Sequence, residues 1–294
     1  MINSLHLNAY ERDLKIRNRS PRTAQNYAET LNQLSEFVDG SDLLELDRTG
    51  VEDYILWTME NRSASSACGR YRALRAFYNW AVREELIPVS PMARMTPPRV
   101  VEQPVPVVGD DDLKLLIKAC SGGSFEDLRD TAIIRLWCEA GSPRVSEMSG
   151  IDVADVDQIV DVVKLTGKGG RTRVIPFGAK TGQAFYRYTR SRARYKGAGG
   201  DALWIGAKRG TRMTASGLFQ MLARRCRQAG IAHIHPHQLR HTSAHQWKLQ
   251  GGSEGDAMVL FGWVSPEMVR RYGRSAEAER ATRSAKRISA ADRL

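Results

Sequence analysis

A single tyrosine near the end of the chain lies among basic residues. In the stretch LFGWVSPEMVRRYGRS, Tyr272 follows two arginines, Arg270 and Arg271. Arg274 comes two positions later, and Trp263 lies nine positions upstream. A phenol has a pKa of about 10 and is a weak nucleophile at neutral pH, but neighbouring guanidinium groups favour its ionised form. The stretch alone is also typical of an ordinary amphipathic residue at a helix end, so the nucleophile hypothesis depends on the rest of the chain.

Two further basic residues lie at turns. Arg144 follows a Gly-Ser-Pro turn in GSPRVSEMSGI, and Glu147, three positions on, is within its reach on one helical face. Lys168 stands between glycines in LTGKGGRTRV, where the backbone turns tightly and a lysine reaches a phosphate or a leaving oxygen. Taken alone, the first pattern is also typical of a surface ion pair and the second of any exposed turn. The spacing of an ATP-binding Walker loop is absent.

Five of the chain's 6 histidines lie in HIHPHQLRHTSAH, namely His233, His235, His237, His241 and His245. One interpretation is a metal site, built from the alternating histidines of a strand and an i, i+4 pair. The other is an anion site, in which His237 and Arg240 share one face of a helix that begins near Pro236. Residues 231–252 contain no Asp or Glu. Hydrolytic zinc sites usually use such a carboxylate, whereas a phosphate site is better without one because a carboxylate repels phosphate. This absence favours the anion site.

These residue types together suit one kind of chemistry. Arginines bind phosphate oxygens in bidentate fashion and match the negative charge that develops at phosphorus in the transition state. With a histidine, a lysine and a tyrosine, they provide the groups for metal-free phosphoryl transfer through a covalent phosphotyrosine.

The elements that must position these residues form a mainly α chain with a small β-hairpin or sheet. In SPRTAQNYAETLNQLSEFV, Ser20 is the expected N-cap before Pro21, and apolar residues recur at helical spacing. Further helices are predicted in TGVEDYILWTMEN and SASSACGRYRALRAFYNWAVREELI, so that the first hundred residues contain helices only. The second part is mixed α/β. Its predicted helices are DDDLKLLIKAC, FEDLRDTAIIRLWCEA, LFQMLARRCRQAG, HQLRHTSAHQWKLQ and SPEMVRRYG, and IVDVVKLTGKGGRTRVIPF predicts a hairpin.

Proline density divides the chain. Six of its 11 prolines lie between Pro88 and Pro106, which forbids a continuous helix there and favours an extended tether. We therefore predict a helical domain over residues 1–95, a proline-rich linker over 96–106, and a second domain over 107–294 that ends in a polar tail.

The charge is unevenly distributed. Residues 1–100 hold 13 basic and 13 acidic residues, and residues 101–294 hold 31 and 20, so the whole excess of +11 lies in the second part. This excess indicates a polyanionic partner, with nucleic acid before a membrane surface. No signal peptide or membrane-spanning run is present in the sequence, which predicts a cytoplasmic protein.

The order of these residues resembles the active-site signature of the tyrosine recombinases, the phage integrase family. PRVSEMSGI resembles the first arginine box of that family, and LTGKGGRTRVIPF its β-hairpin. HPHQLRHTSA is similar to its His-x-x-Arg box, and LFGW…RRY to its tyrosine-bearing end. RSPRTAQNYAETLNQLSEFV and RYRALRAFYNWAVREELI resemble its helical core-binding domain, which clamps the opposite side of the duplex. The resemblance covers nearly the whole chain.

The resemblance implies a site-specific recombinase that cleaves and rejoins DNA without metal, ATP or another cofactor. Tyr272 would attack the scissile phosphate, giving a 3′-phosphotyrosyl link and a free 5′-hydroxyl. Arg144 and Arg240 would hold the non-bridging oxygens.

The remaining roles are also implied by the resemblance. His237 would donate to the phosphate or move the tyrosine proton, and Lys168 would protonate the leaving 5′-oxygen. Trp263 takes a position that the family fills with His or Trp, and Glu147 matches its supporting acid. The predicted DNA-binding residues are Arg62, Arg70, Arg72, Arg75, Arg171 and Arg173.

The chain departs from the family in the turn before Arg144. The family usually has one residue between the glycine and the arginine, whereas Ser142 and Pro143 both intervene here. Proline restricts Ser142 to non-helical geometry, so we expect a reshaped turn that displaces Arg144 in the free protein.

Length gives a further expectation. About eighteen residues precede the Ser20 cap, too few for another domain. A minimal recombinase is therefore predicted, a mobile-element integrase rather than a chromosome-dimer-resolving relative. The tail from Ser275 either docks on a neighbouring protomer or packs on its own chain.

The partners implied by the resemblance are double-stranded DNA attachment or core sites, a homotetramer on two duplexes, and an accessory DNA-bending or directionality protein. Two alternatives remain open from the sequence. One is a non-catalytic DNA-binding protein on the same scaffold, and the other is a histidine-rich metallohydrolase.

Overall fold

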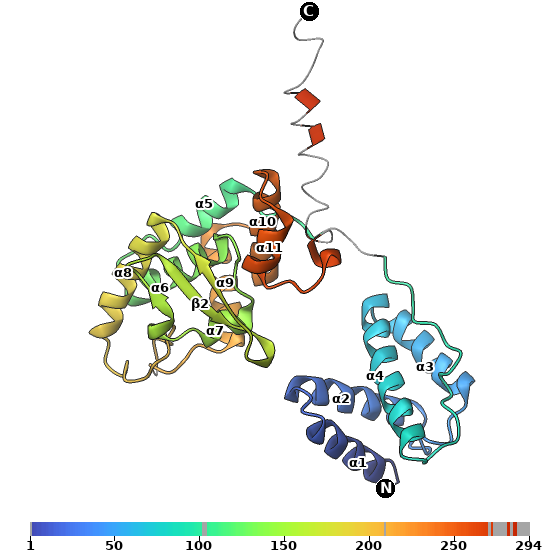
Figure 1. The fold of residues 1–294 in the computed structure, drawn as a ribbon. Helices are drawn as coiled ribbons and strands as arrows, with labels where there is room; N and C mark the ends of the chain where they lie inside the picture. The colour runs from blue at the N-terminus through green and yellow to red at the C-terminus, as the bar shows by residue number, and fades with distance from the viewer. Residues whose placement is uncertain are drawn as a thin grey trace, which may run out of the picture. The chain divides into compact units, whose positions relative to one another are not determined.

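The structure, a computed structural model, describes residues 2–101, 105–208, 210–269, 272, 281–282 and 285–286. Lys168 is described by its backbone alone. The chain divides into two compact units, Met1–Gln103 and Pro104–Leu294 (Figure 1).

The first unit is helical, as predicted for this part of the chain. Its helices are α1 (Ile2–Ile16), α2 (Pro21–Phe37), α3 (Arg48–Asn61) and α4 (Ala64–Arg83). The predicted cap of α2 is confirmed, since Ser20 Oγ accepts a hydrogen bond from the N–H of Thr23 at 3.2 Å. Asp47 and Ser63 cap α3 and α4 in the same way.

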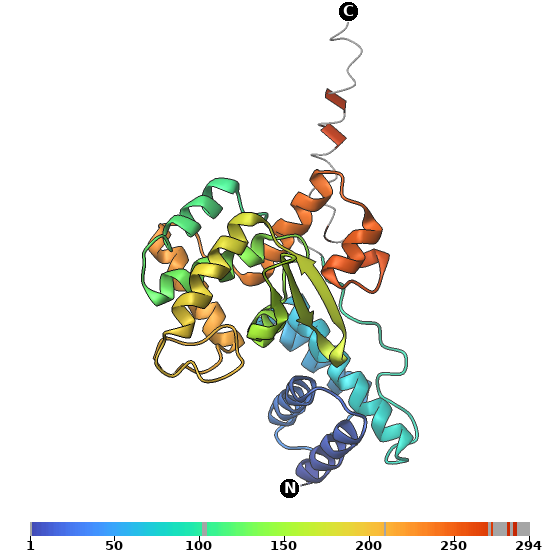
Figure 2. The same ribbon diagram turned by 60° about the vertical axis from the view of Figure 1, so that its left-hand side comes forward.

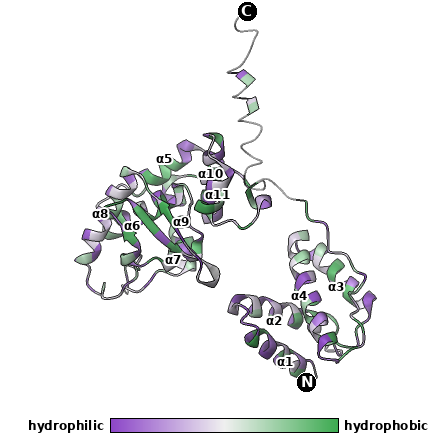
Figure 3. Cartoon of the chain, in the orientation of Figure 1, coloured by the Kyte–Doolittle hydropathy of each residue, from purple (hydrophilic) through white to green (hydrophobic). Residues whose placement is uncertain are grey.

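One apolar core holds the four helices together. Leu31 and Leu34 of α2 are fully buried, and so are Leu74 and Phe77 of α4. Figure 3 shows hydrophobic and hydrophilic residues alternating along these helices. The helical period of the sequence therefore sets which face packs.

The second unit surrounds a three-stranded antiparallel sheet with helices. The strands are β1 (Val156–Asp157), β2 (Val162–Thr166) and β3 (Thr172–Pro176), in the order β1-β2-β3. The helices are α5 (Asp110–Lys118), α6 (Phe125–Cys138), α7 (Val145–Gly150), α8 (Ala179–Ala193), α9 (Ala215–Ala229), α10 (Pro236–Leu249) and α11 (Glu254–Phe261). The mainly α fold with a small sheet is thus confirmed. The sequence did not predict β1, α8 or α11.

The register of the hairpin decides which of its side chains face the core. Val163 pairs with Ile175 and Leu165 pairs with Arg173, and three of these four are fully buried apolar residues. Arg173 therefore lies on the inward face of β3. The outward residues include Val174, which is exposed.

Helices α10 and α11 pack on each other next to the sheet. Figures 1 and 2 show the pair, in orange and red, beside β2 and β3, and α11 contacts β3. α11 begins at the Ser253 cap, whose Oγ accepts from the N–H of Asp256, and ends at Gly262 with φ of +60°. This short helix therefore terminates at the sheet.

The four cysteines are all free thiols. Cys68, Cys120 and Cys226 are buried free thiols, while Cys138 is exposed rather than buried. Among the described residues, no helix is both long and apolar enough to cross a membrane.

The turn at Gly141 generates a prediction for stability. Gly141 has φ of +84°, and an added Cβ would lie 2.5 Å from Ile175 Cγ2 and 2.7 Å from the Leu260 oxygen. Gly141→Ala should therefore lower the free energy of unfolding by about 3 kcal/mol, through backbone strain and overpacking. Urea denaturation measures this loss.

Gly123→Ala is the matched control, because nothing lies within 4 Å of the added Cβ and no positive φ is required. It should change stability by no more than about 0.5 kcal/mol. Equal effects of the two substitutions would contradict the packing argument.

Candidate active site

The turn before Arg144 accommodates the additional residue without removing the arginine from the site. Ser142 N–H donates to the Glu139 oxygen at 3.0 Å, and Arg144 occupies the N-cap position of α7. The Arg144 guanidinium donates to Glu147 Oε1 at 2.9 Å and to the Gly262 oxygen at 3.3 Å. The expected displacement of Arg144 is therefore not found.

Glu147 fixes the start of α7 as well as the arginine. Its Oε2 accepts the backbone N–H of Arg144 at 2.7 Å, the contact that the third residue of a helix makes in a capping box. The predicted neighbours Arg144 and Glu147 are thus in direct contact.

Arg240 lies at the centre of the site and is only 1% exposed. One Nη donates to the Ser142 oxygen and the other to the Phe261 oxygen. Its guanidinium lies over the rings of Phe261, at 5.2 Å, and Trp263, at 6.0 Å. α10 thus brings Arg240 against both the Arg144 turn and the segment that leads to Tyr272.

Arg173, predicted as a DNA contact, faces inward. Its side chain is 9% exposed and forms bonds of 2.6 and 2.9 Å to the two oxygens of Glu147. It also donates to the oxygens of Leu260 and Gly141, at 2.7 and 3.2 Å. The prediction overlooked that Arg173 lies on the same face of the strand as Ile175, which is buried.

Three consecutive carbonyls at the end of α11 each accept from a different arginine. The Leu260 oxygen accepts from Arg173, the Phe261 oxygen from Arg240 and the Gly262 oxygen from Arg144. The last carbonyls of a helix lack partners within the helix and form the negative end of its dipole. The arginines satisfy these carbonyls and are held close together by them.

The cluster has an excess of positive charge. Burial and the charges of Arg144 and Arg173 lower the pKa of Arg240 to about 10, so that it stays charged at neutral pH. Burial alone would raise the pKa of Glu147, but the hydrogen bonds and charge of Arg173 and Arg144 outweigh it and lower the pKa to about 2. Three guanidinium groups therefore surround one carboxylate, an arrangement that favours the binding of a further anion.

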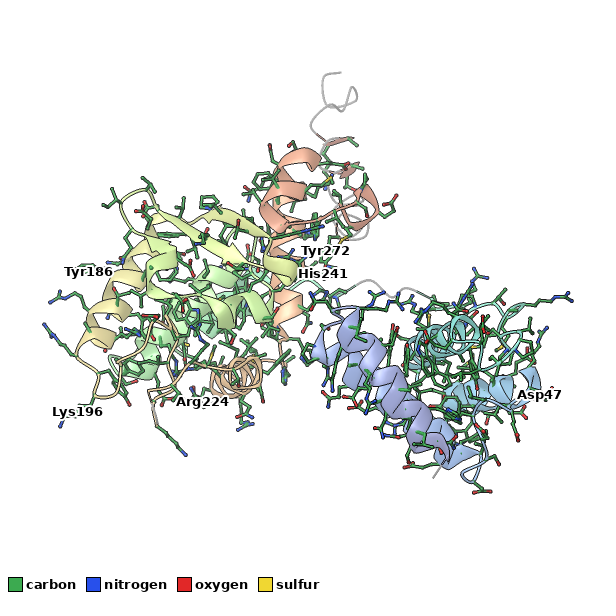
Figure 4. All side chains as sticks on the ribbon, turned by 60° about the horizontal axis from the view of Figure 1, so that its bottom comes forward. Asp47, Tyr186, Lys196, Arg224, His241 and Tyr272 are labelled. Carbon is green, nitrogen blue, oxygen red and sulfur yellow. The ribbon has the colours of Figure 1, made fainter. Side chains whose placement is uncertain are left out.

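Tyr272 lies beside this cluster and is 7% exposed. Its hydroxyl is 3.3 Å from His237 Nε2. Its ring stacks on His241, with centroids 4.1 Å apart, and lies 4.8 Å from the ring of Trp263. Figure 4 shows Tyr272 and His241 next to each other. The structure thus brings together Tyr272, His237, Trp263 and the arginine cluster.

Trp263 supplies a donor that the protein leaves unused. Its ring is 5% exposed, and its buried Nε1–H has no hydrogen-bond partner among the residues that the structure describes. A buried donor without a partner costs about 1–3 kcal/mol. A ligand that accepts this hydrogen bond would recover that free energy.

Some predicted residues lie outside what the structure describes. The side chain of Lys168 is one, and its backbone lies at the tip of the hairpin between β2 and β3. Arg270, Arg271 and Arg274 are also outside the described residues, as is most of the tail from Ser275.

The histidines do not form a metal cluster in the part of the chain that is described. No group of at least three His, Cys, Asp or Glu side chains is placed to hold a metal ion there. His233 and His235 are exposed and stack on each other 4.4 Å apart, whereas His237 and His241 turn to Tyr272.

The predicted DNA-binding arginines of the first unit lie on and next to α4. Arg62, Arg72 and Arg75 are exposed, and Arg70 is half-buried and donates to Thr30 Oγ1 at 2.8 Å. Within the described residues none of the four forms a salt bridge, so their charge is not neutralised internally. Arg171, in the second unit, is exposed as well.

Sequence reasoning missed two contributors to the site. His241 was assigned no role with Tyr272, although it lies one helical turn after His237 on the same face of α10. Phe261 was missed because it contacts Arg240 through its backbone oxygen and its ring, and no sequence motif marks either contact. The Ser253-x-x-Asp256 cap was the available signal for α11.

Two family descriptions match the chain. The phage integrase family matches residues 107–279, and the N-terminal SAM-like domain of phage integrases matches residues 7–85. A tyrosine recombinase XerC of Corynebacterium efficiens is 31% identical over 238 residues, which are 80% of this chain and 75% of the relative.

Solved structures share the fold. The Tn1549 transposon integrase in complex with transposon right-end DNA aligns over 97% of this chain and 99% of its own, with a TM-score of 0.77 and 19% identity. The lambda integrase dimer bound to a core site covers 92% of this chain and 94% of its own, with a TM-score of 0.72 and 17% identity.

The chain therefore belongs to the phage integrase family. It is a site-specific DNA recombinase of the tyrosine class. The sequence relative is named XerC and the two structural neighbours are integrases, so the assignment to a mobile element remains a prediction.

The lowered pKa of Glu147 generates a second prediction. A depressed pKa contributes stability that is present above the ordinary value of 4.5 and is lost as the pH falls towards about 2. At pH 3 the protein should have lost about 2 kcal/mol of this contribution. Glu147→Gln cannot titrate, so its unfolding free energy should fall less between pH 6 and pH 3. Urea denaturation at the two pH values measures the difference.

Asp201→Asn, which removes an exposed acid from the same unit, serves as the control. Its stability should follow that of the unaltered protein over this pH range. The account of Glu147 is wrong if Glu147→Gln shows the same pH dependence as the control.

Proposed function

We propose that Tyr272 is the nucleophile of a DNA strand cleavage and rejoining reaction. The observation that carries the proposal is the position of its hydroxyl, 3.3 Å from His237 Nε2 and beside a cluster of arginines with excess positive charge. The phenol oxygen forms a bond to the scissile phosphorus, and the bond from phosphorus to the 5′-oxygen breaks. A 3′-phosphotyrosyl link and a free 5′-hydroxyl result.

The protons have defined routes. His237 takes the proton of the Tyr272 hydroxyl, because its Nε2 lies 3.3 Å from that hydroxyl. Lys168 protonates the leaving 5′-oxygen, a role that rests on its place at the hairpin tip and on the family resemblance. Rejoining reverses both transfers. The phosphotyrosyl link conserves the phosphodiester bond, so no nucleotide cofactor or metal is assigned to the reaction.

The arginines and the tryptophan bind the phosphate oxygens. The Arg144 side chain is 40% exposed, and its hydrogen bond to the Gly262 carbonyl is long, at 3.3 Å. It can exchange that carbonyl for a phosphate oxygen while its other contact, to Glu147, persists. Arg240, which is buried, contributes its positive charge, and Trp263 Nε1–H donates the hydrogen bond that it lacks in the protein.

The partner is double-stranded DNA in the cytoplasm. The exposed arginines of α4 and Arg171 of the hairpin supply phosphate contacts, which position a protein on DNA without reading the sequence. The lambda integrase dimer on its core site supports a pair of protomers on one duplex. Two such pairs make the tetramer that joins two duplexes, and an accessory DNA-bending or directionality protein completes the reaction.

Trapping of the covalent intermediate tests the proposal. The probe is a duplex selected by the purified protein from a pool of random duplexes, nicked at successive positions in its centre. A nick just beyond the cleavage point releases the 5′-hydroxyl fragment and leaves the protein attached. Incubated in EDTA, the unaltered protein should give an adduct that survives a denaturing gel, and Tyr272→Phe should give none while it still shifts the duplex on a native gel.

Tyr186→Phe is the matched control, since Tyr186 is an exposed tyrosine of α8 that lies away from Tyr272 (Figure 4). It should form the adduct at the unaltered rate. An adduct from Tyr272→Phe removes Tyr272 from the role of nucleophile. Duplex binding without an adduct from any variant would favour a non-catalytic DNA-binding protein.

A further inference from the structure

The Arg173 side chain engages three parts of the catalytic unit at once. Its four hydrogen bonds go to both carboxylate oxygens of Glu147, to the Leu260 oxygen and to the Gly141 oxygen, over distances from 2.6 to 3.2 Å. The accepting residues lie in the turn before α7, within α7, and in the last turn of α11. A hairpin side chain thus connects the elements that carry Arg144 with the segment that leads to Tyr272.

The contact is closely packed as well as polar. Gly262 has φ of +60°, and a Cβ at this position would lie 3.2 Å from Arg173 Cδ. The backbone between α11 and Trp263 therefore rests directly on the Arg173 side chain. Movement of Arg173 must move this backbone or open a gap beneath it.

We propose that Arg173 is a positioning residue for the recombination reaction and not a contact to DNA phosphate. It holds Glu147, which in turn holds Arg144, and it holds the Leu260 carbonyl at the base of the segment that carries Trp263 and Tyr272. The inference rests on the proposed function, because it assigns a role within that same site.

A phosphate contact disagrees with the exposure and the bonding of Arg173. Its side chain is 9% exposed and uses donors on all three of its nitrogens within the protein. Arg171, two residues earlier on the same hairpin, is exposed and forms no salt bridge within the described residues. The two arginines therefore have opposite expected roles: Arg171 binds DNA and Arg173 positions the site.

Glu147 transmits the effect of Arg173. The charged groups that face it are Arg144 at the start of α7, Arg173 on β3 and Arg240 on α10, with the Tyr272 phenol beyond Arg240. When Arg173 is replaced by an apolar residue, Glu147 keeps its burial but loses its strongest partner, so its pKa rises. A protonated Glu147 holds Arg144 weakly, and activity then falls as the pH is lowered. The unaltered protein has no such fall from Glu147 above pH 4.

Three substitutions in the full chain test the inference: Arg173→Met, Arg173→Lys and Arg171→Met. The probe is the selected nicked duplex, at protein concentrations that saturate it. The measurements are the rate of adduct formation from pH 5 to pH 8 and the dependence of duplex affinity on salt concentration. Adduct formation by the unaltered protein is the reference.

For Arg173→Met we expect the saturated rate to fall about 100-fold, the size of effect that a small misplacement of catalytic groups produces. The salt slope, which is the dependence of the logarithm of duplex affinity on the logarithm of salt concentration, should stay unchanged. The rate should fall further towards pH 5, more steeply than for the unaltered protein. Arg173→Lys should recover about tenfold, because it keeps the charge but not the bidentate geometry.

Arg171→Met should show the reverse pattern. Its salt slope should fall by about 0.9, the value for one lost phosphate contact. A reduced salt slope with a normal saturated rate for Arg173→Met overturns the inference and returns Arg173 to the DNA contacts.

Glu147→Gln keeps the inference testable if Arg173→Met does not fold, as judged by circular dichroism. It should lower the saturated rate with an unchanged salt slope, and the double variant with Arg173→Lys should be less than additive, because the two residues act as one unit. Additive effects would overturn the inference. An unaltered protein without an adduct overturns the proposed function and this inference together, whereas an adduct with normal Arg173 variants overturns the inference alone.

Discussion

The site depends on the end of one short helix. The carbonyls of Leu260, Phe261 and Gly262 accept from Arg173, Arg240 and Arg144 in turn. Three guanidinium groups repel one another when they are brought together away from water, and the desolvation of Arg240 adds to this cost. The negative end of α11 and the carboxylate of Glu147 offset the repulsion. The arginines of the proposed phosphate site are therefore held together by backbone oxygens of the protein itself.

The surrounding elements serve this assembly. The positive φ of Gly141 lets the turn pass within van der Waals contact of Leu260, a course that a side chain would block. The inward face of β3 carries Arg173 to the same place, and α10 carries Arg240 and His237 one turn apart. Tyr272 belongs to a small apolar cluster with Phe261 and Trp263, so the proposed nucleophile is held by packing as well as by its hydroxyl.

Most of the fold follows from local patterns in the sequence, and the site follows only in part. The cap at Ser20, the helical stripes and the glycine-rich hairpin are short-range signals, and the structure has helices and strands where they predict them. α11 was missed because its eight residues end in an unbroken apolar run from Ala257 to Phe261, which shows no helical period. The contacts that define the site join residues up to 118 positions apart through backbone oxygens, which carry no residue-specific signal. Arg173 was the exception: its alternation with Ile175 placed it inward, but its charge suggested DNA.

The burial of Tyr272 bears on the fate of a covalent intermediate. At 7% exposure, between the rings of His241 and Trp263, the phenol oxygen has little access to solvent. A phosphotyrosyl ester formed there would meet a DNA hydroxyl held by the protein far more often than a water molecule. Hydrolysis of the ester would leave a broken strand that ends in a 3′-phosphate, while attack by the hydroxyl restores an intact strand. The aromatic rings around Tyr272 would thus favour strand exchange over hydrolysis, because they keep water away from the ester.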